Sequence, residues 1–310
     1  MNKKEFAITK ELAGLRLDQA LARFLDSRMQ AVRLIQAGLV QIADHSKVKP
    51  SYRVEAGDII TLIGEFIKER EDPLKPYDFP VPIVYEDEFL MVVNKPAGLV
   101  VHPSPGHYHD TLVNALIHKL DPNVGSSNGP GLLHRLDKDV SGLLVLSKKQ
   151  TAHTFLAKQF LNRSIKRIYW ALCYQPIRFT KGRVESYLKR HPIDRKKFVS
   201  HPKEGRRSVT LFKMLEKKEL ALIQCQLLTG RTHQARIHSL EISQGIAGDT
   251  VYANPQAVKS IKEPHLLKKI QELNRIALHA VSLQFIHPNT KKEMTFHAPF
   301  PKVLKDLLES

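Results

Sequence analysis

The chain has 310 residues, of which 42% are hydrophobic, and its 48 Lys and Arg residues outnumber 31 Asp and Glu to give a formal net charge of +17. This length and composition are enough to bury a core in one large or two ordinary domains, which excludes a disordered protein. The excess positive charge is typical of nucleic-acid-binding proteins, with an anionic membrane as the alternative partner.

The apolar pattern argues against a membrane. No apolar run approaches the roughly 18 residues that span a bilayer, and the first residues, MNKKE, lack the apolar core of a signal peptide. Only two cysteines occur, Cys173 and Cys225, each within an apolar run, which excludes a disulfide framework and a paired-cysteine zinc site. We therefore expect a soluble, cytoplasmic protein without membrane contact.

Residues 1–72 carry the pattern of a separate small domain. Apolar residues at helical spacing predict a first helix around Leu17–Leu25, and a second helix from about Ser27 to Gln36 would end at Gly38. Alternating residues predict short strands at 40–42 and 59–63. Arginines recur along this segment, at Arg16, Arg23, Arg28 and Arg33.

The spacing of RLD at 16–18, SR at 27–28, Gly38 and GD at 57–58 resembles the S4 (αL-type) domain, a small RNA-binding module. The resemblance implies that the four arginines contact RNA phosphates; a merely solvated basic surface is the alternative, and the net charge favours RNA. Four prolines between 73 and 82 disfavour helix and predict a stiff linker. The expected second domain then covers 83–310.

Strand-like runs dominate this second domain, at 83–85, 89–93 and 99–101. Helices are predicted over Lys149–Leu161 and from about Thr232 to Gly245. The pattern indicates an α+β fold. Residues 189–207 are basic and poorly periodic, which predicts a long loop or hairpin that either is plain solvated surface or contacts phosphates as a flap.

Two motifs carry the chemistry of the second domain. HRLDKDVSG at 134–142 places Asp137 in a tight turn between apolar segments, and LTGRTHQARIH at 228–238 follows an apolar strand with a glycine turn and a basic helix start. An Asp in a turn is more often structural when it stands alone. Together the two motifs resemble the RluA/RluD family of RNA pseudouridine synthases, whose signatures read HRLD-x-x-TSG and TGRTHQ-x-R-x-H.

The resemblance covers nearly the whole chain, including NKPAG at 94–98, GDTVY at 248–252 and FIHP at 285–288. It implies a pseudouridine synthase fold, with a mixed, largely antiparallel β-sheet and flanking helices. It also implies cofactor-free isomerisation of uridine to pseudouridine, and with the S4 module the match is closest to the RluD branch, which acts on large-subunit ribosomal RNA. A carboxylate is chemically adequate for breaking the N1–C1′ bond and forming C5–C1′, since no redox step or group transfer occurs.

The same resemblance assigns roles to individual residues. Asp137 would be the catalytic carboxylate, attacking C1′ or uracil C6 or abstracting a ribose proton. Arg236 would pair with Asp137, and Tyr169 would stack on the target base and help to remove the C5 proton. Arg135 would enter the RNA where the flipped base has left its stack, and Leu278 would form an apolar wall of the uracil pocket.

His134 and Arg231, from the same two motifs, are also expected to contact the substrate. Two positions depart from the family pattern: Val140 replaces the usual Thr, and Ala235 replaces a bulkier Ile or Leu. The first change could loosen the turn behind Asp137, and the second could leave space beside Arg236. Because neither removes the carboxylate, we expect activity to survive.

Other functions fit less well. The histidines at 102, 107 and 109 lack a Cys or Glu at metal-ligand spacing. A kinase loop would have Asp directly after Arg, and a methyltransferase would need a glycine-rich loop after a first strand. The remaining alternatives are an inactive RNA-binding or ribosome-assembly factor and a synthase acting on tRNA. The sequence leaves open which uridine is modified and whether the substrate is free RNA or an assembling ribosomal subunit; a monomer is the simplest expectation.

Overall fold

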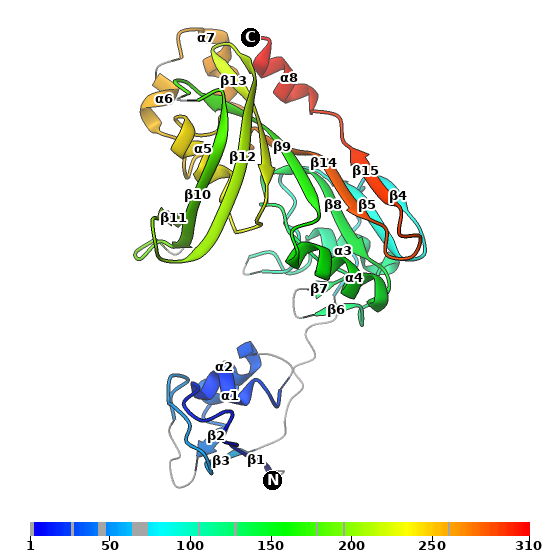
Figure 1. The fold of residues 1–310 in the computed structure, drawn as a ribbon, viewed down its shortest axis with the longest axis vertical. Coiled ribbons are helices and arrows are strands. Elements are labelled where there is room, and N and C mark those ends of the chain that lie inside the picture. Colours follow the sequence, from blue (N-terminus) through cyan, green and yellow to red (C-terminus); the bar gives the residue numbers. More distant parts are fainter. Residues whose placement is uncertain are drawn as a thin grey trace. The chain divides into compact units, whose positions relative to one another are not determined.

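The computed structural model describes residues 3–25, 28–42, 48–63, 74–104, 106–126, 129–177, 179–194, 196–259 and 261–310. The chain divides into two compact units, Met1–Pro73 and Leu74–Ser310 (Figure 1). Among the described residues, no helix is both long enough and apolar enough to cross a membrane.

The described residues of the first unit form a three-stranded antiparallel sheet and two helices. Its strands lie in the order β1-β3-β2, and its elements are β1 (Lys3–Ala7), α1 (Leu17–Leu21), α2 (Arg28–Gln36), β2 (Val40–Ile42) and β3 (Ile59–Ile63). Apolar residues of the helices, such as Leu17 and Ile35, pack against strand residues such as Ile60. Strand β1 has no counterpart in the sequence prediction, because its residues are mostly exposed and show no apolar alternation.

In the described part of the second unit, ten strands form one sheet in the order β11-β10-β12-β13-β9-β14-β8-β5-β4, with β15 paired to β14. The strands are β4 (Ile83–Glu86), β5 (Leu90–Lys95), β8 (Ser141–Ser147), β9 (Lys166–Tyr174), β10 (Lys181–Arg190), β11 (Phe198–His201), β12 (Arg206–Lys217), β13 (Leu220–Leu227), β14 (Leu278–Ile286) and β15 (Glu293–His297). Among these described strands, β14 and β8 pair in parallel and the other pairs are antiparallel. The expected mixed, largely antiparallel sheet is confirmed.

Helices and short elements surround this sheet. They are α3 (Leu112–Leu116), η1 (Ile117–Lys119), the pair β6 (Gly125–Ser126) and β7 (Gly129–Pro130), α4 (Gln150–Leu161), α5 (Gln234–Ile242), α6 (Pro255–Lys259), α7 (Pro264–Gln271) and α8 (Lys302–Leu308). Helices α4 and α5 confirm the two predicted helices. The predicted strand at 99–101 is wrong, because Val100 makes only an isolated bridge to Thr111. The basic stretch 189–207 contains the end of β10, all of β11 and the start of β12. Both β11 and β12 pair antiparallel with β10, which fits the hairpin alternative.

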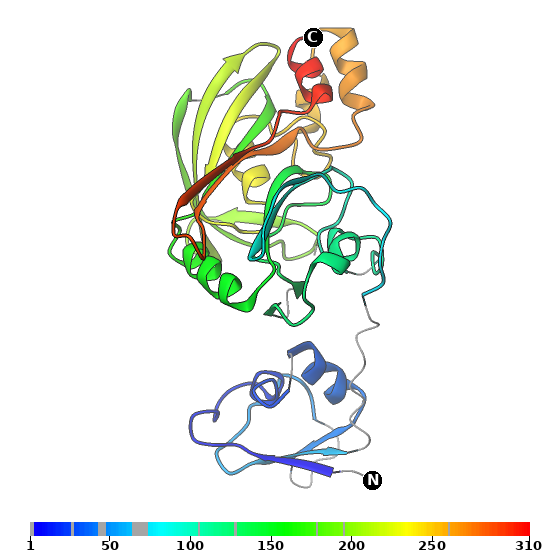
Figure 2. The ribbon, with the colours of Figure 1, turned by 90° about the vertical axis from the view of Figure 1, so that its right-hand side faces the viewer.

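Both faces of β5 and β8 are covered, which explains their unbroken apolar sequences. Leu90 packs in a cluster with Leu156 of α4, whereas its neighbour Met91 belongs to the cluster that contains Leu112 of α3. Figure 2 shows α3 and α4 on opposite sides of these strands. All seven residues of β8 are buried as a result, as is usual for a strand with elements on both faces.

The proline-rich stretch, predicted as a stiff linker, packs along the second unit in its described part. In its described part, 74–82, Tyr77, Phe79 and Val81 pack against the core of the second unit. The Asn114 side chain donates a hydrogen bond of 2.9 Å to the carbonyl of Lys75. Alternating apolar residues between the prolines give this segment one partly buried side, so its described part belongs to the second unit.

Acid should destabilise the protein through its buried histidines. Burial lowers the pKa of His238 and of His279 to about 4, so between pH 6.5 and 4 the unfolded chain binds protons that the folded chain does not. Stability is then lost as the pH falls through this window, by up to about 3 kcal/mol per histidine. Urea unfolding of His238→Gln should show a flatter decline than the parent protein, whereas His297→Gln, at an exposed position, should not. An equally steep decline in both variants would contradict the expectation.

Candidate active site

The turn that carries Asp137 lies between β7 and β8 and is held by the segment after β5. The Val140 amide donates to the Asp137 carbonyl at 3.1 Å, and the Gly98 amide donates to the Lys138 carbonyl at 2.9 Å. The ammonium of Lys95 donates to the same Lys138 carbonyl at 3.0 Å and to two more carbonyls of its own segment. Burial lowers the pKa of Lys95 to about 7. These bonds fix the backbone beside the carboxylate.

Arg236 of α5 bridges two carboxylates. Its Nη1 donates to Asp137 at 3.1 Å, while Nε and Nη2 donate to Asp249 at 2.7 and 2.9 Å. The Asp249 side chain is 0% exposed. Burial alone would lower the pKa of Arg236, but the bonds to Asp249 and Asp137 raise it. The guanidinium is therefore fixed and charged, and it presents one N–H to Asp137.

The start of α5 explains the second motif. Gln234 accepts hydrogen bonds from the Thr229 hydroxyl at 2.6 Å and the Arg231 amide at 3.1 Å, and it donates to the Val209 carbonyl at 3.0 Å. His233 caps the helix in the left-handed conformation, with φ of 59°. Gln234 thus ties the turn before α5 to β12, which aims Arg236 at Asp137.

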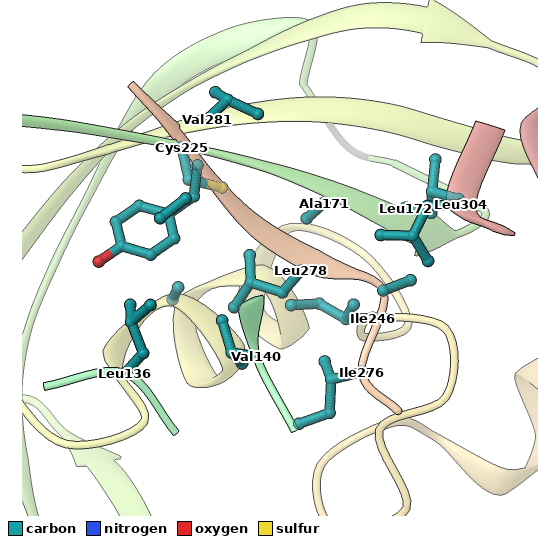
Figure 3. Packing of buried hydrophobic residues seen from close by; sticks show 14 of the residues in the cluster. Leu136, Val140, Ala171, Leu172, Cys225, Ile246, Ile276, Leu278, Val281 and Leu304 are labelled. Carbon is teal, nitrogen blue, oxygen red and sulfur yellow. The ribbon is translucent and has the colours of Figure 1, made fainter. Parts of the chain in front are cut away.

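A small pocket brings six of the seven predicted catalytic and substrate residues together: Arg135, Asp137, Tyr169, Arg231, Arg236 and Leu278. Leu136, Val140, Leu227, His233, Gln234 and Ala235 complete its lining. Leu136 and Val140 face Leu278 of β14 in the packed core (Figure 3). Val140, one departure from the family pattern, is 2% exposed and its apolar side chain belongs to this core.

Tyr169 lies on β9 and is 5% exposed. Burial raises the pKa of its phenol; Arg167 acts against this shift, and Asp137 adds to it. The phenol is therefore neutral, and the Tyr169 side chain lines the pocket.

The structure does not place His134 in the pocket. Its Nε2 accepts a hydrogen bond from the Val145 amide at 3.2 Å, and its ring lies 5.0 Å from that of Phe160. Burial and the charge of Arg167 lower the pKa of His134 to about 3. The neighbouring Arg135 does line the pocket, and successive side chains of an extended segment point to opposite sides. His134 therefore points away from the pocket and anchors the motif to β8 and α4.

The arginines of the first unit have different surroundings. Arg16 donates to Asp18 at 3.0 Å, and that carboxylate is only 2% exposed. Arg23 is exposed and borders a surface hollow with Leu15 and Gln19. The side chains of Arg28 and Arg33 lie outside the described residues.

Sequence reasoning missed two residues that organise the site, Asp249 and Tyr252. The Tyr252 ring lies under the Arg236 guanidinium at 4.8 Å, and its hydroxyl is 2.7 Å from His233 Nδ1. Asp249 also accepts the Tyr252 amide at 3.1 Å. Both belong to GDTVY at 248–252, a motif that supported the family resemblance but received no functional assignment. The sequence signal that could have identified Asp249 is a carboxylate that follows a glycine among apolar residues.

Comparison with known proteins agrees with this geometry. A family model described as RNA pseudouridylate synthase matches residues 89–241, and an S4 domain model matches residues 15–60. The "Ribosomal large subunit pseudouridine synthase D" of Zymomonas mobilis is 38% identical, covering 100% of this chain and 98% of that protein. The chain belongs to the RNA pseudouridine synthase family.

Other relatives of this pseudouridine synthase are similar over their full length. The Escherichia coli K12 protein named ribosomal large subunit pseudouridine synthase D is 36% identical over 97% of this chain and 92% of its own. A Bacillus subtilis protein, named as an uncharacterized RNA pseudouridine synthase, is 35% identical over 100% and 98%. The solved structure of human RNA pseudouridylate synthase domain containing 4 is 26% identical, covers 74% of this chain and 92% of that chain, and has a TM-score of 0.56. This pseudouridine synthase isomerises uridine to pseudouridine in RNA, and its first unit contains the expected S4 domain.

Proposed function

We propose that this enzyme modifies uridines of large-subunit ribosomal RNA, with Asp137 as the catalytic carboxylate. The names of the full-length relatives support the substrate. The observation that carries the site is the pocket in which Asp137, Arg236 and Tyr169 meet, although they are far apart in sequence.

The chemistry assigned to this pocket balances within the nucleotide. The N1–C1′ bond of uridine breaks, the base turns, and a C5–C1′ bond forms, while C5 loses a proton and N1 gains one. Arg236 orients the Asp137 carboxylate for attack on C1′ or C6, or for removal of a ribose proton. Tyr169 stacks on the base, Leu278 forms the apolar wall of the uracil pocket, and Arg135 fills the vacated stack.

The deciding experiment measures tritium release from RNA labelled at uridine C5, comparing large-subunit ribosomal RNA with bulk tRNA. We expect release from the ribosomal RNA and little from tRNA. Release from tRNA alone would replace the proposed substrate by tRNA. No release from either RNA, with tight binding retained, would favour an RNA-binding or assembly factor. Repeating the assay with assembling subunits would separate free from particle-bound substrate.

We also propose that the enzyme acts as a monomer in the cytoplasm. One chain supplies every residue of the pocket, which supports the first part. The proposed ribosomal substrate supports the second.

Removing the S4 unit should weaken RNA binding and flatten its salt dependence. The cut belongs before Leu74, because Tyr77, Phe79 and Val81 pack on the catalytic unit. Each lost phosphate contact should reduce the slope of log K against log salt by roughly 0.7 to 0.9. The measurement is filter binding of ribosomal RNA to residues 74–310 and to the full chain between 50 and 200 mM salt. Over this range the RNA affinity should change by about tenfold or more. Identical slopes would show that the S4 unit makes no phosphate contact.

A further inference from the structure

Three side chains meet behind the Asp137 motif, outside the pocket. The ring of Phe160, at the end of α4, contacts both His134 and Arg167 of β9. The His134 ring centroid is 5.0 Å from that of Phe160, and the Arg167 guanidinium carbon is 5.3 Å from the same ring. This histidine–arginine cluster is not used by the proposed chemistry.

Arg167 is a buried cation for which the described part of the chain supplies no anion. The residue is 9% exposed, and its guanidinium makes no hydrogen bond or ion pair with a described residue; its Nε is buried without an acceptor there. Arg236, by contrast, bridges two carboxylates. Keeping an unpaired guanidinium out of water is unfavourable, so a site that retains one is suited to an anion supplied from outside.

His134 contributes a second donor without an acceptor. Because its Nε2 accepts the Val145 amide, the proton of the neutral ring sits on Nδ1. That Nδ1 is also buried, and no described residue accepts its hydrogen bond. The cluster therefore holds two N–H groups, one of them charged, for which no described residue supplies an oxygen partner.

A glycine connects this cluster to the pocket rim. A Cβ on Gly230 would lie 2.5 Å from Arg167 Nη1, so the glycine lets the guanidinium lie against the turn that carries Arg231. Arg231 lines the pocket. Burial and the charges of Arg206 and Arg163 lower the pKa of Arg231, and none of these arginines forms an ion pair with a described carboxylate. Arg207 differs, since Glu185 pairs with it.

We propose that Arg167 and Arg231 form a subsite for one phosphate group of the RNA backbone beside the reacting uridine. The planar guanidinium of Arg167 supplies paired donors for phosphate oxygens, and Arg231 adds a second cation at the rim. Such a contact carries no base information and fixes the register of the nucleotide over Asp137. The subsite rests on the proposed function only in taking RNA as its ligand.

Binding measurements in the Asp137→Asn background test the subsite without turnover of the RNA. A large-subunit ribosomal RNA transcript is titrated at several salt concentrations with that protein and with the same protein carrying Arg167→Gln. Arg167→Gln should weaken binding about tenfold or more and reduce the salt slope by roughly 0.7 to 0.9. Lys268→Gln on α7, a 72% exposed position, removes the same charge away from the pocket and should leave the slope unchanged.

Thermal unfolding shows whether Arg167→Gln is folded. If Arg167→Gln does not fold, the salt slope of RNA binding is measured instead for Arg231→Gln, at a half-buried position of the pocket rim. An unchanged slope in the folded variant would mean that the two donors serve an ordered water only, and would overturn the proposal. Tritium release by the parent enzyme is measured on the same transcript. Release with an unchanged slope rejects the subsite alone, whereas a reduced slope without release supports the subsite and rejects the proposed substrate.

Discussion

Asp137→Asn should abolish pseudouridine formation and leave the affinity for RNA within a few-fold. The amide has nearly the same shape as the carboxylate and can still accept the hydrogen bond that Arg236 Nη1 donates at 3.1 Å. It is neutral, however, and cannot act as a nucleophile or a base. Loss of such a group costs on the order of 10⁴-fold or more in rate. Tritium release under single-turnover conditions measures the rate, and filter binding measures the affinity.

A matched control distinguishes the catalytic carboxylate from a general loss of negative charge. Asp121→Asn removes one carboxylate from an exposed turn, where Asp121 accepts the Asn123 amide at 2.8 Å. We expect this variant to keep parental activity. Pseudouridine formed by Asp137→Asn at more than a few per cent of the parental rate would remove Asp137 from its assigned role.

Arg236→Met should destabilise the fold as well as stop the reaction. Asp249 is 0% exposed and would lose both hydrogen bonds to Arg236, which leaves a buried carboxylate without a cation. Breaking a buried pair from one side costs about 3–5 kcal/mol. Urea unfolding followed by circular dichroism would show the change as a lower midpoint.

A second substitution distinguishes the loss of the Arg236–Asp249 ion pair from the cost of leaving the Asp249 carboxylate buried alone. Arg236→Met combined with Asp249→Asn removes the stranded charge but keeps an acceptor for the Tyr252 amide, and it should recover much of the lost stability without the activity. Arg236→Lys keeps the charge without the planar fork and should fall between the parent and Arg236→Met. If Arg236→Met costs less than about 1 kcal/mol, a figure typical of exposed pairs, then Asp249 does not depend on this guanidinium.

The sequence predicted the larger architecture well because its signals are local. Helix α4 follows from apolar spacing, and the Asp137 turn follows from its motif. Strand β1 and the packed arm at 74–82 were missed, since an exposed strand and an extended proline-rich segment lack a strong periodic signal.

The site shows a similar division. The motifs predicted that Asp137, Arg236 and Tyr169 belong together, and the pocket contains all three. They did not show that His134 turns away from the pocket, because side-chain direction depends on the path of the backbone. The role of Asp249 depends on a contact with Arg236, 13 residues away in sequence, which spacing alone does not reveal.

The position of β14 has a consequence for synthesis of the protein. This late strand lies between β9 and β8 and pairs with both, and a Cβ on Gly142 of β8 would lie only 2.4 Å from the Ala280 backbone of β14. The two halves of the sheet therefore have no shared strand until residues 278–286 leave the ribosome. Since Leu278 also lines the pocket, a nascent chain acquires its complete active site only after β14 has emerged and paired with β8 and β9.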